Sequence, residues 1–120
     1  TDVTGFGLMG HLTEMCEGSK LSAIVEFEKV PKLQEAREYI EAKCLPGGLH
    51  KNWHTYKAHV HLVVDAYKPI LFDPQTSGGL LIAVEEKDTE KVEQILKDNN
   101  LEHKAFGMLT PSAEKLITVR

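Results

Sequence analysis

Apolar side chains in the first part of the chain repeat with the period of a helix and then with that of a strand. The first apolar stripe predicts a helix over residues 8–17, which Gly18 can end as a left-handed cap. Residues 21–27 alternate in character, are rich in β-branched and aromatic types, and predict a strand with one fully buried face. Pro31 suits a first helical turn, and the apolar spacing that follows predicts a second helix over residues 32–43, before Leu45-Pro46-Gly47-Gly48 stops the pattern.

The second part of the chain gives a less uniform pattern. Residues 49–72 are ambiguous, because 58–64 alternate like a strand whereas Leu62, Ala66 and Ile70 could lie along a helix. The apolar run 79–84 predicts a buried strand. A stripe of Val92, Ile95 and Leu96 then predicts a helix capped by Asp88 or Thr89. Two last strands are predicted near 104–109 and 115–119, separated by a short turn. This order predicts an α/β (α+β) fold, in which helices cover a mixed β-sheet.

The composition indicates one folded domain over residues 1–120 and excludes several classes of protein. A chain of 120 residues can bury roughly two thirds of its unfolded surface, and 42% hydrophobic with 27% charged residues argues against disorder. No apolar run approaches the ~18 residues of a membrane span, and a net charge of −4 lacks the basic excess of a nucleic-acid binder. We therefore expect neither a membrane nor a nucleic acid as partner.

The ends and the cysteines suggest where such a chain belongs. Cys16 and Cys44 are too few for a disulfide framework and lack a redox or zinc spacing, and no signal-peptide pattern is present, so we expect a cytoplasmic protein. The first residue is Thr1 rather than Met, which indicates numbering that begins inside a longer protein.

Two loops combine an acidic residue, hydroxyls and closely spaced glycines: TDVTGFG at residues 1–7 and DPQTSGG at residues 73–79. Such loops can aim backbone N–H groups at an anion while a carboxylate holds a cation. Asp2 is a hard oxygen donor of the kind that Mg²⁺ prefers. The same residue types also make ordinary turns, so their composition leaves both interpretations open.

Three segments together closely resemble the C-terminal half of the selenophosphate synthetases, also called selenide, water dikinases. They are TDVTGFGLMGHL at 1–12, PGG at 46–48 with Asn52 four residues on, and DPQTSGGLLIAV at 73–84. The family belongs to the aminoimidazole ribonucleotide synthetase-like superfamily, whose members join an N-terminal ATP-binding domain to a C-terminal α/β domain of this size. The resemblance implies an ATP-dependent enzyme that converts selenide, ATP and water into selenophosphate, AMP and phosphate. It also implies two partners, the N-terminal domain and, in the full-length enzyme, a second copy in a homodimer.

The resemblance carries over to individual residues. Asp2 matches the aspartate that helps to bind the Mg²⁺ ions holding the ATP phosphates, and Thr4, Gly5 and Gly7 would form the loop wall beside it. The family's catalytic cysteine or selenocysteine and its partner lysine lie in an N-terminal segment that is absent here. We therefore expect no catalytic residue in this chain and no activity from it alone. Many family members carry Thr after PGG where this chain has Leu49, which leaves any role of that segment open.

Other reactive or aromatic residues receive structural interpretations. Cys16 lies on the apolar stripe of the first helix, where a cysteine is usually an inert packing residue, and His11 of GHL is expected to order that helix. Trp53 and Tyr56 either contact the N-terminal domain or complete this domain's own core. Four histidines match no zinc signature and are expected at the surface or an interface; they are His50, His54, His59 and His61.

Two further hypotheses remain beside the leading one. DPQTSGG is shared in part with the ribonucleotide synthetases, so another member of the superfamily is possible, such as an aminoimidazole ribonucleotide synthetase, a thiamine-phosphate kinase or a hydrogenase maturation factor. TDVTGFG followed by GHL favours the selenium enzyme. The third hypothesis is a free-standing binding or dimerisation module that keeps the fold without catalysis.

Overall fold

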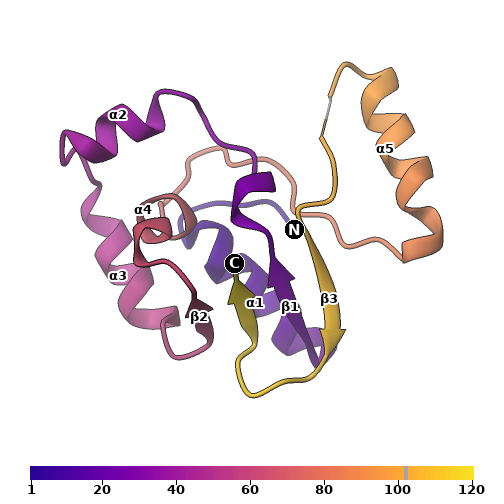
Figure 1. Ribbon diagram of the computed structural model, residues 1–120, viewed down its shortest axis with the longest axis horizontal. Helices are drawn as coiled ribbons and strands as arrows, with labels where there is room; N and C mark the ends of the chain where they lie inside the picture. The colour runs from indigo at the N-terminus through magenta and orange to yellow at the C-terminus, as the bar shows by residue number, and fades with distance from the viewer. Residues whose placement is uncertain (102) are drawn as a thin grey trace.

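A computed structural model describes residues 1–101 and 103–120, and its centre is a four-stranded mixed sheet (Figure 1). The strands are β1 (Leu21–Val25), β2 (Val60–Leu62), β3 (Gly107–Pro111) and β4 (Ile117–Val119), in the order β2-β4-β1-β3. β4 runs parallel to both β1 and β2, whereas β3 is antiparallel to β1. The predicted mixed sheet with helices is confirmed.

The strand predicted over residues 21–27 forms β1 and occupies an inner position of the sheet. Ala23, Val25 and Phe27 are buried, as the alternation predicts, although Phe27 already belongs to a short 3-10 helix (Phe27–Lys29). The two C-terminal strands form near their predicted places, but they do not pair with each other. Both pair with β1, one on each side, so their short connection passes over the end of β1.

The structure contains the three helices that the sequence pattern predicts, one of them shorter than predicted. α1 (Gly7–Ser19) extends the predicted first helix by a residue or two at each end, and its left-handed cap is Lys20 rather than Gly18, with a φ of 58°. α2 (Ala36–Glu41) is shorter than the predicted 32–43 and buries none of its residues. α5 (Thr89–Asp98) lies where it is predicted. Figure 1 shows α2 and α5 on opposite sides of the molecule, projecting from the sheet.

The ambiguous region 49–72 contains both kinds of structure. α3 (Gly47–Tyr56) begins within the glycine pair that the sequence pattern treats as a stop, because extended Pro46 leads directly into the helix. β2 follows, then a 3-10 helix (Asp65–Tyr67) and α4 (Lys68–Leu71). A further 3-10 helix (Glu86–Asp88) precedes α5. In the part of the chain that the structure describes, no helix combines the length and apolar character needed to cross a bilayer.

The strand predicted over residues 79–84 is not found. Only Leu80 forms an isolated bridge, with Asp2, and Gly79 adopts a left-handed φ of 82°. Leu81 is buried, but Leu80 is 74% exposed and Ile82 is 52% exposed. The prediction is wrong because an apolar run makes a strand only where a neighbouring chain offers hydrogen bonds, and pairing with the N-terminal segment stops at Leu81.

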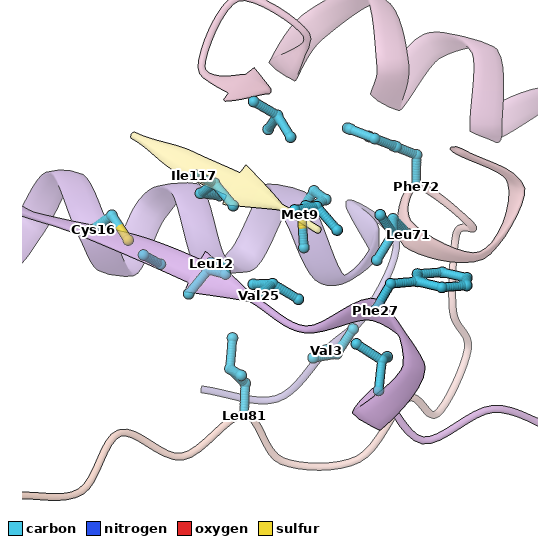
Figure 2. Packing of buried hydrophobic residues seen from close by; sticks show 14 of the residues in the cluster. Val3, Met9, Leu12, Cys16, Val25, Phe27, Leu71, Phe72, Leu81 and Ile117 are labelled. Carbon is cyan, nitrogen blue, oxygen red and sulfur yellow. The ribbon is translucent and has the colours of Figure 1, made fainter. Parts of the chain in front are cut away.

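The hydrophobic core lies between α1 and the sheet and extends toward the segment after α4 (Figure 2). Met9, Leu12 and Cys16 enter it from α1, while Leu71 and Phe72 close it at the other end. Trp53 and Tyr56 are partly buried and pack against this core, with the Trp53 ring 5.1 Å from that of Phe72 in an edge-on arrangement. Val3 and Leu81 also belong to the core, which fixes the two loops flanking the start of α1.

Candidate functional site

The two loops singled out by their composition lie side by side and form a short antiparallel ribbon. We call residues 1–7 the Asp2 loop and residues 73–81 the Gln75 loop. Val3 N–H donates to the Gly79 carbonyl at 2.8 Å, and Gly78 N–H returns a bond to the Val3 carbonyl at 3.0 Å. Leu81 N–H donates to the Thr1 carbonyl at 2.8 Å. Residues nearly eighty positions apart in the sequence therefore share one backbone ladder.

This ribbon decides which way the Asp2 side chain points. Successive side chains of an extended segment face opposite sides, and residues directly opposite each other share a side. Val3 and Leu81 face the core, where they are 6% and 7% exposed. Asp2, which bridges Leu80, is exposed together with it. A register shift of one residue would bury the carboxylate and expose Val3, so the ladder fixes the site.

Two glycines allow the loops to approach so closely. A Cβ on Gly78 would lie 2.7 Å from the Val3 carbonyl oxygen and 3.0 Å from the Val3 Cβ. Gly7 is buried at the start of α1 with a φ of 70°, and a Cβ there would lie 2.8 Å from the Asp73 carbonyl oxygen. These positions exclude any larger side chain unless the backbone moves.

Thr4 joins three parts of the site. Its carbonyl accepts from Gly7 N–H at 3.0 Å and from Gln75 N–H at 3.1 Å, and its hydroxyl lies 3.1 Å from His11 Nε2. His11 is 7% exposed and its Nδ1 faces a carboxylate oxygen of Glu14 at 3.3 Å. The sequence assigned His11 to helix order; the structure shows that it connects α1 to the Asp2 loop.

A third segment, helix α3, contacts the same site through Asn52. Asn52 is 6% exposed and donates to the carbonyls of Gly5 and Phe72, which belong to the Asp2 loop and to the residue just before the Gln75 loop. Asp73 accepts a bond from the Gln75 side-chain amide at 3.0 Å, and burial raises the pKa of the Asp73 carboxyl. Sequence reasoning gave no role to Asn52 and treated Asp73 only as the acidic residue of a loop that could bind ions or form an ordinary turn, although both belong to the segments that carry the family resemblance.

The sequence-predicted site residues are thus close together but differ in exposure. Asp2 and Gly5 are exposed, Thr4 is half-buried and Gly7 is buried beneath the loop. Within residues 1–101 and 103–120, the Asp2 carboxylate forms no ion pair or hydrogen bond, and no group of three or more His, Cys, Asp or Glu side chains is placed to hold a metal. A free surface carboxylate suits Mg²⁺, which commonly takes one or two protein carboxylates and completes its shell with phosphates and water.

An open cavity of about 800 Å³ lies on the inner side of the Gln75 loop, between it and α2. Asp73, Gln75 and Ser77 contribute its polar wall, and Leu8, Ile70 and Leu81 are among its apolar residues. Asp2 does not line it. The cavity thus adjoins both loops, and Leu80, the bridge partner of Asp2, lines it although Asp2 itself does not.

The remaining reactive side chains are two cysteines and four clustered histidines. Cys16 is fully buried on α1, and burial raises the pKa of its thiol, whereas Cys44 is exposed and lines the cavity beside the Gln75 loop. Three of the four clustered histidines are exposed, and His59 is half-buried near Glu17, its Nδ1 lying 3.8 Å from a carboxylate oxygen. These placements agree with an inert Cys16 and with surface histidines.

Comparison with known proteins supports the resemblance seen in the motifs. Residues 1–119 match the family model described as AIR synthase related protein, C-terminal domain. A protein of Haemophilus influenzae (strain 86-028NP) named selenide, water dikinase is 46% identical over 119 residues, which cover 99% of this chain and 34% of that protein. Proteins of the same name from Colwellia psychrerythraea and Pasteurella multocida are 42% and 48% identical, covering 99% and 91% of this chain but 35% and 31% of theirs. The chain spans about a third of the length of the curated relatives it matches.

Proposed function

Because this chain belongs to the family of C-terminal domains of AIR synthase related proteins, we propose that it is the C-terminal domain of a selenophosphate synthetase. In this proposal the full-length enzyme makes selenophosphate from selenide, ATP and water, and releases AMP and phosphate. The domain supplies one Mg²⁺-binding carboxylate, Asp2, and a loop wall to an ATP site formed mostly elsewhere. Support comes from relatives named selenide, water dikinase that align with nearly the whole chain.

The observation that carries the proposal is the outward carboxylate of Asp2 on a hydrogen-bonded ribbon. Val3 and Leu81 are held in the core, so the backbone that carries the carboxylate is held in place while the carboxylate itself is paired with no described cationic group. Mg²⁺, when bound, would neutralise and orient phosphate charge, since phosphoryl transfer relies mainly on positioning and electrostatics. One carboxylate from this chain leaves the remaining coordination positions to phosphate oxygens, water and the N-terminal domain.

The loop wall has two different components. Gly5 is exposed with open space around it, so its backbone is accessible to a phosphate group. Thr4 and Gly7 support the loop on its buried side. The Thr4 carbonyl accepts hydrogen bonds from Gly7 N–H, at the start of α1, and from Gln75 N–H in the Gln75 loop. We assign no nucleophile to this chain, since the Cys16 thiol is fully buried and the resemblance assigns no catalytic role to exposed Cys44. The catalytic group then belongs to the remaining two thirds of the enzyme.

We also propose that an N-terminal ATP-binding domain covers the Asp2 side of this domain, within a cytoplasmic homodimer. Two exposed apolar side chains on the same loops support such a cover, namely Phe6 at 49% and Leu80 at 74% exposure. Apolar groups grouped beside a polar site commonly mark a surface that another domain contacts.

The test uses the full-length protein that contains this chain. Asp2→Ala is expected to abolish ATP-dependent selenophosphate formation, followed by phosphorus NMR, while circular dichroism and size-exclusion profiles stay unchanged. Asp98→Ala is the matched control, because Asp98 is an exposed aspartate on α5 whose side chain accepts a hydrogen bond from Gln94. Near-normal turnover in Asp2→Ala would remove Asp2 from the metal site.

Two further measurements separate the alternatives. ATP consumption that does not require selenide would favour another synthetase or kinase of the superfamily. Calorimetric titration of the isolated 120-residue chain with Mg-ATP is expected to show little binding, and tight binding would contradict the view that most of the nucleotide site lies outside this domain.

A further inference from the structure

The Asn52 side chain donates hydrogen bonds to backbone carbonyls on both sides of the candidate site. It lies on the inner face of α3, far in sequence from both loops, and is 6% exposed. Its amide nitrogen donates to the Gly5 carbonyl at 2.9 Å and to the Phe72 carbonyl at 3.1 Å. A single NH₂ group thus links the end of the Asp2 loop to the residue that precedes the Gln75 loop.

The two acceptors explain why this position carries an amide. Both partners are carbonyl oxygens, so the side chain must present two N–H donors to them, and the NH₂ group of Asn does so from one atom. Aspartate has the same shape but would turn a carboxylate oxygen toward the carbonyls. Serine has one donor and a shorter reach. Alanine would leave both carbonyl groups without this partner.

Helix α3 packs against the Gln75 loop, and this packing holds the backbone of Asn52 in place. Leu49 is buried in the core one turn earlier, and Gly48 lies so close to Pro74 that a Cβ there would be 2.9 Å from the Pro74 Cγ. The segment PGG followed by Asn52 therefore has a structural reason: the absence of a side chain at Gly48 lets the helix approach Pro74, and Asn52 bonds to the Asp2 loop and to Phe72, the residue before the Gln75 loop.

Only two residues separate Gly5 from Asp2, and both are held by hydrogen bonds to other parts of the domain. Between them, Val3 is held by the ribbon and Thr4 by Gly7, Gln75 and His11. Gly5 is the last residue of the loop for which the structure gives a tertiary backbone bond before α1 begins. Loss of the Gly5 bond would loosen this end of the loop, so that the bonds of Val3 and Thr4 alone would hold the backbone next to Asp2.

We propose that Asn52 is a positioning residue that holds the Asp2 carboxylate in place for a divalent cation by fixing the separation of the two loops. The proposal rests on the metal-binding role of Asp2 proposed above. Asn52 itself faces the protein interior and contacts neither metal nor nucleotide. Its effect is that of an outer-shell partner, whose loss typically weakens metal binding without removing a ligand.

The experiment compares Asn52→Ala, Asn52→Gln and Asn99→Ala in the full-length protein. Asn99 is the matched control, because its amide also donates to a backbone carbonyl, that of Ile95, but at the exposed end of α5. Asn52→Ala is expected to raise the Mg²⁺ concentration for half-maximal turnover by roughly 10- to 100-fold, with kcat recovering at saturating Mg²⁺. Asn52→Gln keeps both donors and is expected to recover part of this loss, and Asn99→Ala to behave like the unmodified protein.

A second readout does not depend on activity. Hydrogen–deuterium exchange, followed by mass spectrometry without nucleotide, is expected to speed up in Asn52→Ala for peptides covering residues 1–7 and 73–81 and to stay unchanged in β1 and β4. Unchanged exchange in the two loops would overturn the proposal. So would faster exchange throughout the domain together with a kcat that excess Mg²⁺ does not restore, because that pattern belongs to a merely structural residue.

The outcomes also separate this inference from the proposed function. An active Asp2→Ala variant rejects the metal-binding role of Asp2 and with it the role of Asn52. An inactive Asp2→Ala variant combined with an unaltered Mg²⁺ requirement in Asn52→Ala rejects the role of Asn52 alone.

Discussion

Replacing Gly78 by alanine tests whether the ribbon between the two loops is as tight as the structure shows. The new Cβ would lie 2.7 Å from the Val3 carbonyl oxygen and 3.0 Å from the Val3 Cβ and Cγ1, and two of these three atoms belong to a side chain packed in the core. Overpacking of this kind costs about 1–3 kcal/mol. Weakening the Gly78–Val3 hydrogen bond costs about 1 kcal/mol more, and the reduced freedom of the unfolded chain returns about 0.4–1 kcal/mol.

The net expectation is a loss of about 2 kcal/mol in the free energy of unfolding. For 120 residues the entropy of unfolding is about 0.25 kcal/mol per kelvin, so Tm should fall by about 8 °C. Thermal unfolding of the 120-residue chain, followed by circular dichroism, measures this shift. Urea unfolding should give a lower midpoint with an unchanged m-value, because the surface exposed on unfolding stays the same.

Gly18→Ala is the matched control with the opposite expected sign. Gly18 lies within α1 and does not adopt a positive φ. A Cβ added there would have no atom of another part of the chain within 4 Å. Alanine there should stabilise the chain by about 0.5–1 kcal/mol, since it favours the helix without any overlap. A Gly78→Ala chain that melts at or above the unmodified one, or a Gly18→Ala chain that loses as much stability, would refute the close approach of the loops.

Three further changes test the core, the cysteines and the buried carboxyl. Phe72→Ala removes a fully buried ring and should cost about 3–5 kcal/mol in urea unfolding, a loss that a stability change under 1 kcal/mol would contradict. A thiol reagent should modify Cys44 in the folded chain and Cys16 only after unfolding; rapid modification of both would show that α1 is not packed as described. Burial raises the pKa of Asp73 above 3.8, so the folded state binds this proton more tightly and the carboxyl reduces stability as pH rises through that range. Asp73→Asn should therefore raise the urea midpoint at neutral pH and not below the unfolded pKa, whereas an equal shift at both pH values would contradict the assignment to burial.

Local patterns were sufficient for the elements whose apolar face meets the core. The stripe that ends at Cys16 predicts α1, and the alternation through Ala23 and Val25 predicts β1, because in both the buried positions recur with the period of the element itself. The stripe on α5 also predicts its helix, although that helix buries no residue. The three motif segments identified the family, which the comparisons confirm.

The same local patterns were misleading where structure depends on a distant partner. The run 79–84 has the composition of a strand, but only its first residues find a partner, in the N-terminal segment. The Gly-Gly pair at 47–48 looks like a helix stop, yet it begins α3, because Gly48 allows that helix to lie against Pro74.

The sequence by itself therefore determined α1 and β1, the approximate places of β3 and β4, the class of fold and the residue types of the candidate site. Only the tertiary structure decided that Asp2 faces outward, that its loop is paired with residues 78–81, and that Asn52 bonds to both sides. The physical reason is range. Periodicity and turn chemistry act within a few residues, whereas the direction of a carboxylate is set by hydrogen bonds and close packing between segments that meet only when the chain has folded.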